Sequence, residues 1–222
     1  MQRPKNLDRS ARNLDEMGTV LIVDISGYTR FVHEADYIQG SRVMTRLLGV
    51  LMETNQLGLR VSEIEGDAIL FYLPGRPPLP SILKQQFEAM IDGFWDLTRQ
   101  MSESVPQASR LSIKMVAHYG RIIEFSLKGF RKLYGEAVIE AHRLLKNNVD
   151  SNTYILITEI LLSFHPDDAC QDQRVVHMCE TYDFGTICYR YLQYKRPGQS
   201  DDQPFTQKVI QHTPIELHLA AS

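Results

Sequence analysis

Two aspartates, each placed at the tip of a short apolar segment, are the residues of this sequence best suited to chemistry. Asp24 ends the apolar run 21–23, and Asp67 directly precedes the apolar run 68–73. A carboxylate at the end of a buried strand is unfavourable unless it is paired or binds a cation. If the two strand ends are neighbours, the pair predicts an oxygen-rich site for Mg²⁺ or Mn²⁺. Alternatively, each aspartate could simply occupy the turn beside its strand.

The residues that follow Asp24 predict a phosphate-binding segment. Ser26 and Gly27 interrupt the apolar run, and a helical pattern begins after them. Backbone N–H groups at the start of a helix bind phosphate because they have no partner within the helix. The N–H groups of Ile25 to Thr29 therefore could hold a polyphosphate beside cations bound by the aspartates.

Together, these segments resemble the class III nucleotidyl cyclases, the family of adenylyl and guanylyl cyclase catalytic domains. The first, Asp24-Ile-Ser-Gly-Tyr-Thr29, resembles the family motif Asp-Ile-x-Gly-Phe-Thr. The second, Gly66-Asp-Ala68, resembles part of the family's second metal motif and lies at close to the family's spacing. The resemblance covers roughly residues 18–195. Within the family, the chain looks most like an uncharacterised bacterial cyclase-like group, through segments 63–67 and 142–147.

The resemblance implies conversion of a nucleoside triphosphate into a 3′,5′-cyclic nucleotide and pyrophosphate with two metal ions, Mg²⁺ or Mn²⁺. It makes Asp24, the carbonyl group of Ile25, and Asp67 the metal ligands. Arg143 corresponds to the arginine that stabilises the transition state from a partner subunit, a role that suits its permanent charge. The resemblance therefore implies a homodimer. It assigns phosphate binding to Ser26, Gly27, Tyr28 and Thr29.

Other positions depart from the family. The base-selecting positions of adenylyl cyclases, lysine and aspartate, here hold Glu63 and Lys132. These two side chains could pair with each other or select another base. Ile139 replaces the asparagine that binds ribose, and the triphosphate-binding lysine falls near Phe184. The alternatives are thus an active cyclase, a degenerate nucleotide or metal sensor or dimerisation module on the same fold, and an unrelated ferredoxin-like binding protein.

The order of the apolar patterns predicts an α+β protein with a ferredoxin-like βαββαβ core. A turn at His118-Tyr-Gly120 is expected to separate two strands, and His118 to be a half-buried strand histidine. Residues 129–135 are expected to form a loop. We expect strands at 18–24, 111–117, 121–127, 154–158, 174–180 and 186–194, a hairpin at 59–73, and helices at 29–56, with a possible break at 36–40, and at 81–101, 136–147 and 159–164.

Composition limits the class of protein and the functions that remain possible. Of the 222 residues, 43% are hydrophobic and 23% charged, as in a soluble globular domain, and the net charge of −3 gives no reason to expect nucleic-acid binding. No apolar run is long enough to span a membrane, and the first residues do not resemble a signal peptide. Three cysteines without a CxxC pattern indicate reduced thiols and a cytoplasmic protein. We expect a flexible arm at 1–16, a cyclase-like catalytic domain at 17–196 and a tail at 197–222.

Overall fold

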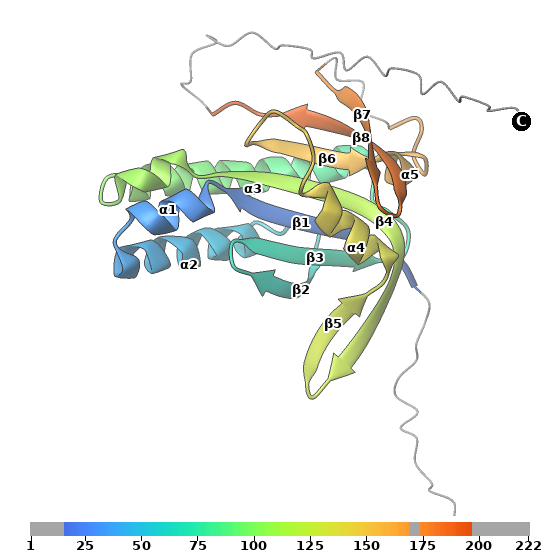
Figure 1. Cartoon of the computed structure of the whole chain (residues 1–222), viewed down its shortest axis with the longest axis horizontal. Helices are drawn as coiled ribbons and strands as arrows, with labels where there is room; N and C mark the ends of the chain where they lie inside the picture. Colours follow the sequence, from blue (N-terminus) through green and yellow to red (C-terminus); the bar gives the residue numbers. More distant parts are fainter. Residues whose placement is uncertain (1–15, 169–173, 197–222) are drawn as a thin grey trace, which may run out of the picture.

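A mixed β-sheet with helices on both faces positions all the residues singled out above (Figure 1). The computed structural model describes residues 16–168 and 174–196. The strands follow the order β2-β3-β1-β4-β6-β8-β7, and β5 pairs with β4 outside this path. Their bounds are β1 Glu16–Ser26, β2 Arg60–Glu65, β3 Ala68–Pro74, β4 Ser112–Leu127, β5 Phe130–Tyr134, β6 Tyr154–Thr158, β7 Val176–Tyr182 and β8 Gly185–Gln193.

The helices agree broadly with the predicted ones. The helical pattern expected at 29–56 is divided into two helices. The first ends at Glu34, and Asp36 caps the second by accepting hydrogen bonds from the N–H groups of Ile38 and Gln39. The helix expected at 136–147 is shorter than predicted. The bounds are α1 Tyr28–Glu34, α2 Tyr37–Glu53, α3 Pro80–Met101, α4 Glu136–Leu144 and α5 Glu159–Leu162, with a 3₁₀ turn η1 at Pro106–Arg110.

The central strand β1 is buried on both faces. Leu21, Val23 and Ile25 enter the main core, which includes residues of α2 and α3. Val20 and Ile22 enter a second cluster, which includes residues of α4. Since side chains alternate along a strand, Asp24 points to the same face as Val20 and Ile22. Asp24 therefore lies on the face of the sheet that α4 covers.

The predicted turn at residues 118–120 is wrong. β4 is one continuous strand, in which His118 pairs with Val20 and Gly120 pairs with Gly18. The strand continues because β1 extends beside it and keeps its backbone groups hydrogen-bonded. The chain reverses later, at Lys128 and Gly129, which both adopt positive φ angles. The loop predicted at 129–135 is also wrong, since these residues include β5.

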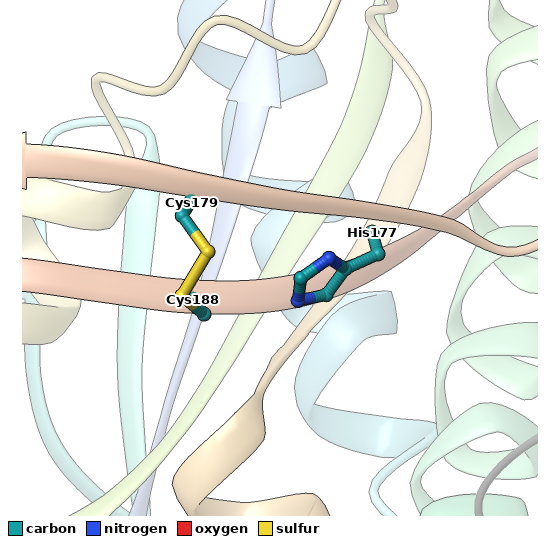
Figure 2. Close-up of side chains that lie close together, drawn as sticks. All are labelled: His177, Cys179 and Cys188. Atoms are coloured by element: carbon teal, nitrogen blue, oxygen red, sulfur yellow. A yellow bond between two sulfur atoms is a disulfide. The ribbon is translucent and has the colours of Figure 1, made fainter. Parts of the chain in front are cut away.

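The expectation of reduced thiols is wrong for two of the three cysteines. Cys179 of β7 and Cys188 of β8 face each other in the ladder and form a disulfide (Figure 2). Strand pairing brings their Cα atoms to 4.0 Å. For these two residues, the argument from unpaired thiols to a reducing compartment therefore loses its basis. Cys170 lies outside the described residues.

The α+β class is confirmed, and the strand pair near the carboxyl end is present. The arm predicted at 1–16 lies outside the described residues apart from Glu16, the first residue of β1, and so does the tail at 197–222. Among residues 16–168 and 174–196, no helix combines the length and apolar character needed to span a membrane.

Candidate functional site

Asp24 and Asp67 lie next to each other at one end of the sheet. Asp24 is opposite Ala68 in the register of β1 and β3. The N–H group of Ile25 donates a hydrogen bond of 3.1 Å to the carbonyl oxygen of Asp67. Both aspartates are half-buried, so neither is sealed from solvent. The structure thus brings the two acids together, and their role as metal ligands remains a prediction.

The two carboxylates influence each other electrostatically. Burial raises the pKa of Asp67, and the negative charge of Asp24 raises that pKa further. Its own backbone N–H group and the ammonium group of Lys114 act in the opposite direction. A divalent cation bound beside both carboxylates would relieve the repulsion that raises the pKa of Asp67. Their chemistry therefore fits Mg²⁺ or Mn²⁺.

Lys114 of β4 is a residue of this site that the sequence did not reveal. It lies opposite Asp24 in the register of β1 and β4, and its Nζ is 3.1 Å from Asp24 Oδ2. Nζ also donates to the carbonyl oxygen of Leu145, directly after α4, at 3.3 Å. The alternating pattern at 111–117 indicated a polar face at Lys114, but it could not indicate which strand would lie beside that face. Lys114 balances part of the charge of Asp24.

The predicted phosphate-binding segment borders a cleft of about 330 Å³. Ser26 and Gly27 line it together with Arg30 and Arg110. Gly27 has a φ of 90°, a conformation that favours glycine, and it lets the chain pass from β1 into α1. The two arginines were not predicted. Arg30 stands one residue after the motif and could have been noticed, whereas Arg110 approaches only through the folding of η1 beside α1.

Both cleft arginines contact one acid. Arg30 Nε lies 2.6 Å from Glu34 Oε1, and Arg110 Nη1 lies 2.8 Å from Glu34 Oε2. The arginines lower the pKa of Glu34, chiefly through the hydrogen bond from Arg30. Tyr28 and Thr29 begin α1; Tyr28 packs against the core and Thr29 is exposed. The cleft therefore combines two cations with backbone groups of the predicted phosphate-binding segment.

Glu63 and Lys132, at the base-selecting positions, form an ion pair between β2 and β5. The Glu63 side chain is 17% exposed and that of Lys132 is 44% exposed, so the carboxylate is the more enclosed partner. Of the two alternatives left open by the sequence, this pairing is the one seen in the single chain. A role in base selection stays a prediction.

Arg143 lies on the exposed side of α4. Within the described residues it pairs with Asp183, in the turn between β7 and β8, with 3.4 Å between Nη2 and Oδ2. The fold thus does not join Arg143 to the two aspartates within one chain. Ile139, on the same helix, is 57% exposed. Both features leave this surface of α4 open to a second molecule.

The contacts of His118 indicate a structural role. It is only 3% exposed, and its Nδ1 lies 3.1 Å from Thr158 Oγ1 of β6. Its Nε2 is 2.5 Å from a carboxylate oxygen of Glu140 on α4, although the angles do not satisfy a hydrogen bond. His118 is therefore more buried than the predicted half-buried strand histidine, and it links β4 to β6 and α4.

Sequence comparison identifies the family. A model described as "Protein of unknown function (DUF2652)" matches residues 44–154. An uncharacterised protein of Mycobacterium tuberculosis is 30% identical over 172 residues, which cover 72% of this chain and 76% of that protein. This chain belongs to the DUF2652 family. The matched part of the DUF2652 chain contains Asp67 and Lys114, and Asp24 precedes it.

Solved structures similar to this DUF2652 protein are nucleotidyl cyclase domains. The guanylyl cyclase Cya2 has a TM-score of 0.63 and 16% identity, covering 84% of this chain and 97% of its own. The adenylyl cyclase CyaB from P. aeruginosa has a TM-score of 0.52 and 18% identity, covering 82% and 96%. A bacterial light-regulated adenylyl cyclase has a TM-score of 0.55 and 16% identity, covering 79% and 88%. At these identities the likeness shows the fold alone, and the predicted cyclase fold is confirmed.

Proposed function

We propose that this DUF2652 protein is a nucleotidyl cyclase-like homodimer that converts a nucleoside triphosphate into a 3′,5′-cyclic nucleotide and pyrophosphate. The observation that carries the proposal is the pair Asp24 and Asp67, half-buried at adjacent strand ends, with the pKa of Asp67 raised by its burial and by Asp24. Such a pair is suited to cations that also bind phosphate oxygens. The cyclase fold around it supplies the context.

In this proposal, two Mg²⁺ or Mn²⁺ ions are held by Asp24, Asp67 and the carbonyl oxygen of Ile25. Cations held there would supply stabilisation of the negative charge on the reacting phosphate oxygens. The segment from Ser26 to Thr29 orients the polyphosphate, and Arg30 and Arg110 add positive charge beside it. Lys114 keeps the charge of Asp24 partly balanced in the absence of cations.

A homodimer is proposed because the family resemblance assigns the transition-state arginine to a partner subunit, and within one chain Arg143 pairs with Asp183 instead. Arg143 is exposed and lies on α4, where a partner could receive it. The hairpin of β4 and β5 projects away from the sheet (Figure 1). This hairpin, called the β4–β5 arm below, exposes the apolar side chains of Phe125, Leu127 and Phe130. Such an arm is suited to contact with a second copy, which would remove apolar surface from water.

A second candidate function is a nucleotide or metal sensor without turnover. Three observations favour it: Glu63 is paired with Lys132, Arg143 is paired with Asp183, and Ile139 offers no hydrogen bond to a ribose. Loss of one preorganised polar contact typically costs about 10²–10³ in rate. The substitutions could therefore reduce catalysis strongly while leaving binding of metal and triphosphate intact.

The decisive experiment measures both turnover and binding. Purified protein is incubated with Mn²⁺ and each of the four ribonucleoside triphosphates, and cyclic product is detected by mass spectrometry. Asp24→Asn is expected to lower product formation by about 10²–10³ and to abolish metal-dependent triphosphate binding. Asp92→Asn, at an exposed position of α3, is the matched control and should change neither.

The outcomes separate the two candidates. Product from the unmodified protein supports the cyclase. Binding without product, sensitive to Asp24→Asn, supports the sensor. Binding that survives Asp24→Asn would show that the site lies elsewhere. The solution mass, measured with and without triphosphate, tests the homodimer, and Phe130→Ser in the β4–β5 arm should weaken association.

A further inference from the structure

A second group of potential metal ligands lies on an exposed face of the β7–β8 hairpin, which β4 and β6 separate from the strand that carries Asp24. His177 and Cys179 are two residues apart on β7 and therefore point to the same face, and Cys188 faces Cys179 from β8 (Figure 2). One ligand atom from each of the three lies within 4.8 Å of the others. His177 and Cys179 are exposed and Cys188 is half-buried, so solvent can reach the group.

We propose that the reduced form of this hairpin binds Zn²⁺, or a divalent cation with the same ligand preference, through the two cysteine thiolates and the His177 imidazole. Thiolate and imidazole are the ligands that Zn²⁺ prefers, and three protein ligands leave one position for water. The β7–β8 ladder, from the pair Val176 and Tyr191 to the pair Tyr182 and Gly185, places the two cysteines opposite each other, and its backbone hydrogen bonds do not involve the sulfurs. The backbone therefore arranges the ligands in advance.

The disulfide and the metal site exclude each other. In the oxidised hairpin the two sulfurs are bonded to one another and neither is a thiolate. A dithiol reductant supplies the two electrons that cleave the bond and itself becomes a cyclic disulfide, leaving two cysteine thiols. Each thiol then loses its proton as the cation binds. The site thus binds metal only when the hairpin is reduced.

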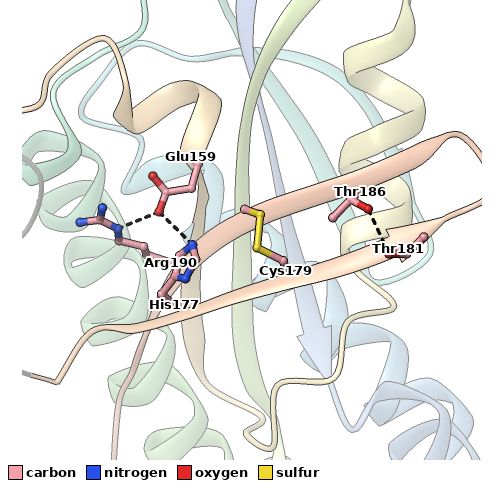
Figure 3. The surroundings of a disulfide bond; sticks show 7 residues. Glu159, His177, Cys179, Thr181, Thr186 and Arg190 are labelled. Carbon is pink, nitrogen blue, oxygen red and sulfur yellow. Dashed lines mark hydrogen bonds and ion pairs between the residues drawn. A yellow bond between two sulfur atoms is a disulfide. The ribbon is translucent and has the colours of Figure 1, made fainter. Parts of the chain in front are cut away.

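Glu159 of α5 supports the imidazole. Its Oε1 lies 3.5 Å from His177 Nε2 and 2.8 Å from Arg190 Nε (Figure 3). A histidine that binds a metal through one ring nitrogen commonly donates the other N–H to a carboxylate, which orients the ring and raises its basicity. Arg190, opposite His177 on β8, fixes the position of that carboxylate. Glu159 therefore supports the His177 ligand, and Arg190 in turn supports Glu159.

The test uses the full chain with Cys170→Ser as the background, so that only the two hairpin cysteines remain. Co²⁺ is the probe, because thiolate ligands give it a charge-transfer absorption that carboxylates do not. After reduction by a phosphine and removal of oxygen, the protein should bind one Co²⁺ with this absorption, and Zn²⁺ should displace it. The oxidised protein, which is the folded reference, should show no such absorption.

Variants assign the ligands. Cys179→Ser and Cys188→Ser should each abolish the charge-transfer absorption, and His177→Ala should weaken Co²⁺ binding by at least about tenfold. Thr181→Ala, on the same face of β7, is the matched control and should leave binding unchanged. Equal binding by oxidised and reduced protein, or no thiolate absorption after reduction, would overturn the proposal. Asp24→Asn should retain the absorption, so failure of the cyclase proposal does not affect this one.

Discussion

The two groups of potential metal ligands in this chain differ in ligand chemistry and in setting. The aspartate site is built from half-buried oxygen ligands at the ends of central strands, with Lys114 as a fixed counter-charge. The hairpin site is built from sulfur and nitrogen ligands on an outer face of two strands at the edge of the sheet. Oxygen ligands suit Mg²⁺ and Mn²⁺, whereas thiolate and imidazole suit Zn²⁺. If both proposals hold, the two cation sites would not compete for the same ion.

The largest expected effect is on the stability that the disulfide gives to the β7–β8 hairpin. Removal of the Cys179–Cys188 disulfide should lower the free energy of unfolding by about 2–3 kcal/mol, the loop-closure entropy for a short loop; the two cysteines are nine positions apart. Denaturant unfolding in a metal chelator, with and without reductant, measures it. The double variant Cys179→Ser, Cys188→Ser should show no dependence on reductant. Equal stability of oxidised and reduced protein would contradict the prediction.

The next effect concerns the counter-charge of the aspartate site. Lys114→Met should tighten Mn²⁺ binding by about tenfold, because no ammonium group then competes for Asp24. Lys114→Arg keeps the charge and serves as the control. Isothermal titration calorimetry with Mn²⁺ measures the affinity. Weaker binding by Lys114→Met would mean that Lys114 organises the site rather than opposing the cation. The Co²⁺ absorption of the reduced hairpin should not change.

A smaller effect follows from the raised pKa of Asp67. Because its pKa in the folded protein lies above the unfolded value, the folded state retains the proton more readily. At pH values above the folded pKa, the ionised Asp67 therefore lowers the free energy of unfolding. This loss disappears as the pH falls through the unfolded pKa. In a chelator, Asp67→Asn should raise Tm near neutral pH by about 2 °C, the scale for a domain of this size. Thermal unfolding at several pH values tests whether the gain vanishes in acid.

The smallest effect concerns the pair at the base-selecting positions. Glu63→Gln and Lys132→Met, alone and combined, form a double-mutant cycle. Because the Lys132 side chain is 44% exposed, solvent screens the pair and the coupling energy should be below about 1 kcal/mol. Denaturant unfolding measures this coupling. A larger value would indicate that the pair is a structural element of β2 and β5 and is not available to a nucleotide base.

Much of the fold followed from local patterns in the sequence. Apolar runs and helical periodicity predicted β1, α3, β6 and the hairpin of β2 and β3, since each of these buries a face visible in its own residues. The error at residues 118–120 arose because His118 and Gly120 read locally as a turn. Their place in a strand depends on β1, about a hundred positions away in the sequence. Local reading also missed β5, which is a strand because β4 pairs with it.

The sequence by itself determined the two aspartates and the order of the apolar segments, which predicted the α+β class, and the resemblance of segments 24–29 and 66–68 implied the cyclase fold. These features depend on residue type and on patterns within each segment. Only the tertiary structure placed Lys114 beside Asp24, Arg110 at the cleft lined by Ser26 and Gly27, and Cys188 opposite Cys179. Each of these contacts joins separate elements whose register is set by backbone hydrogen bonding and by burial of both faces of the sheet. A charge or thiol carries no local sign of the neighbour that such pairing will give it.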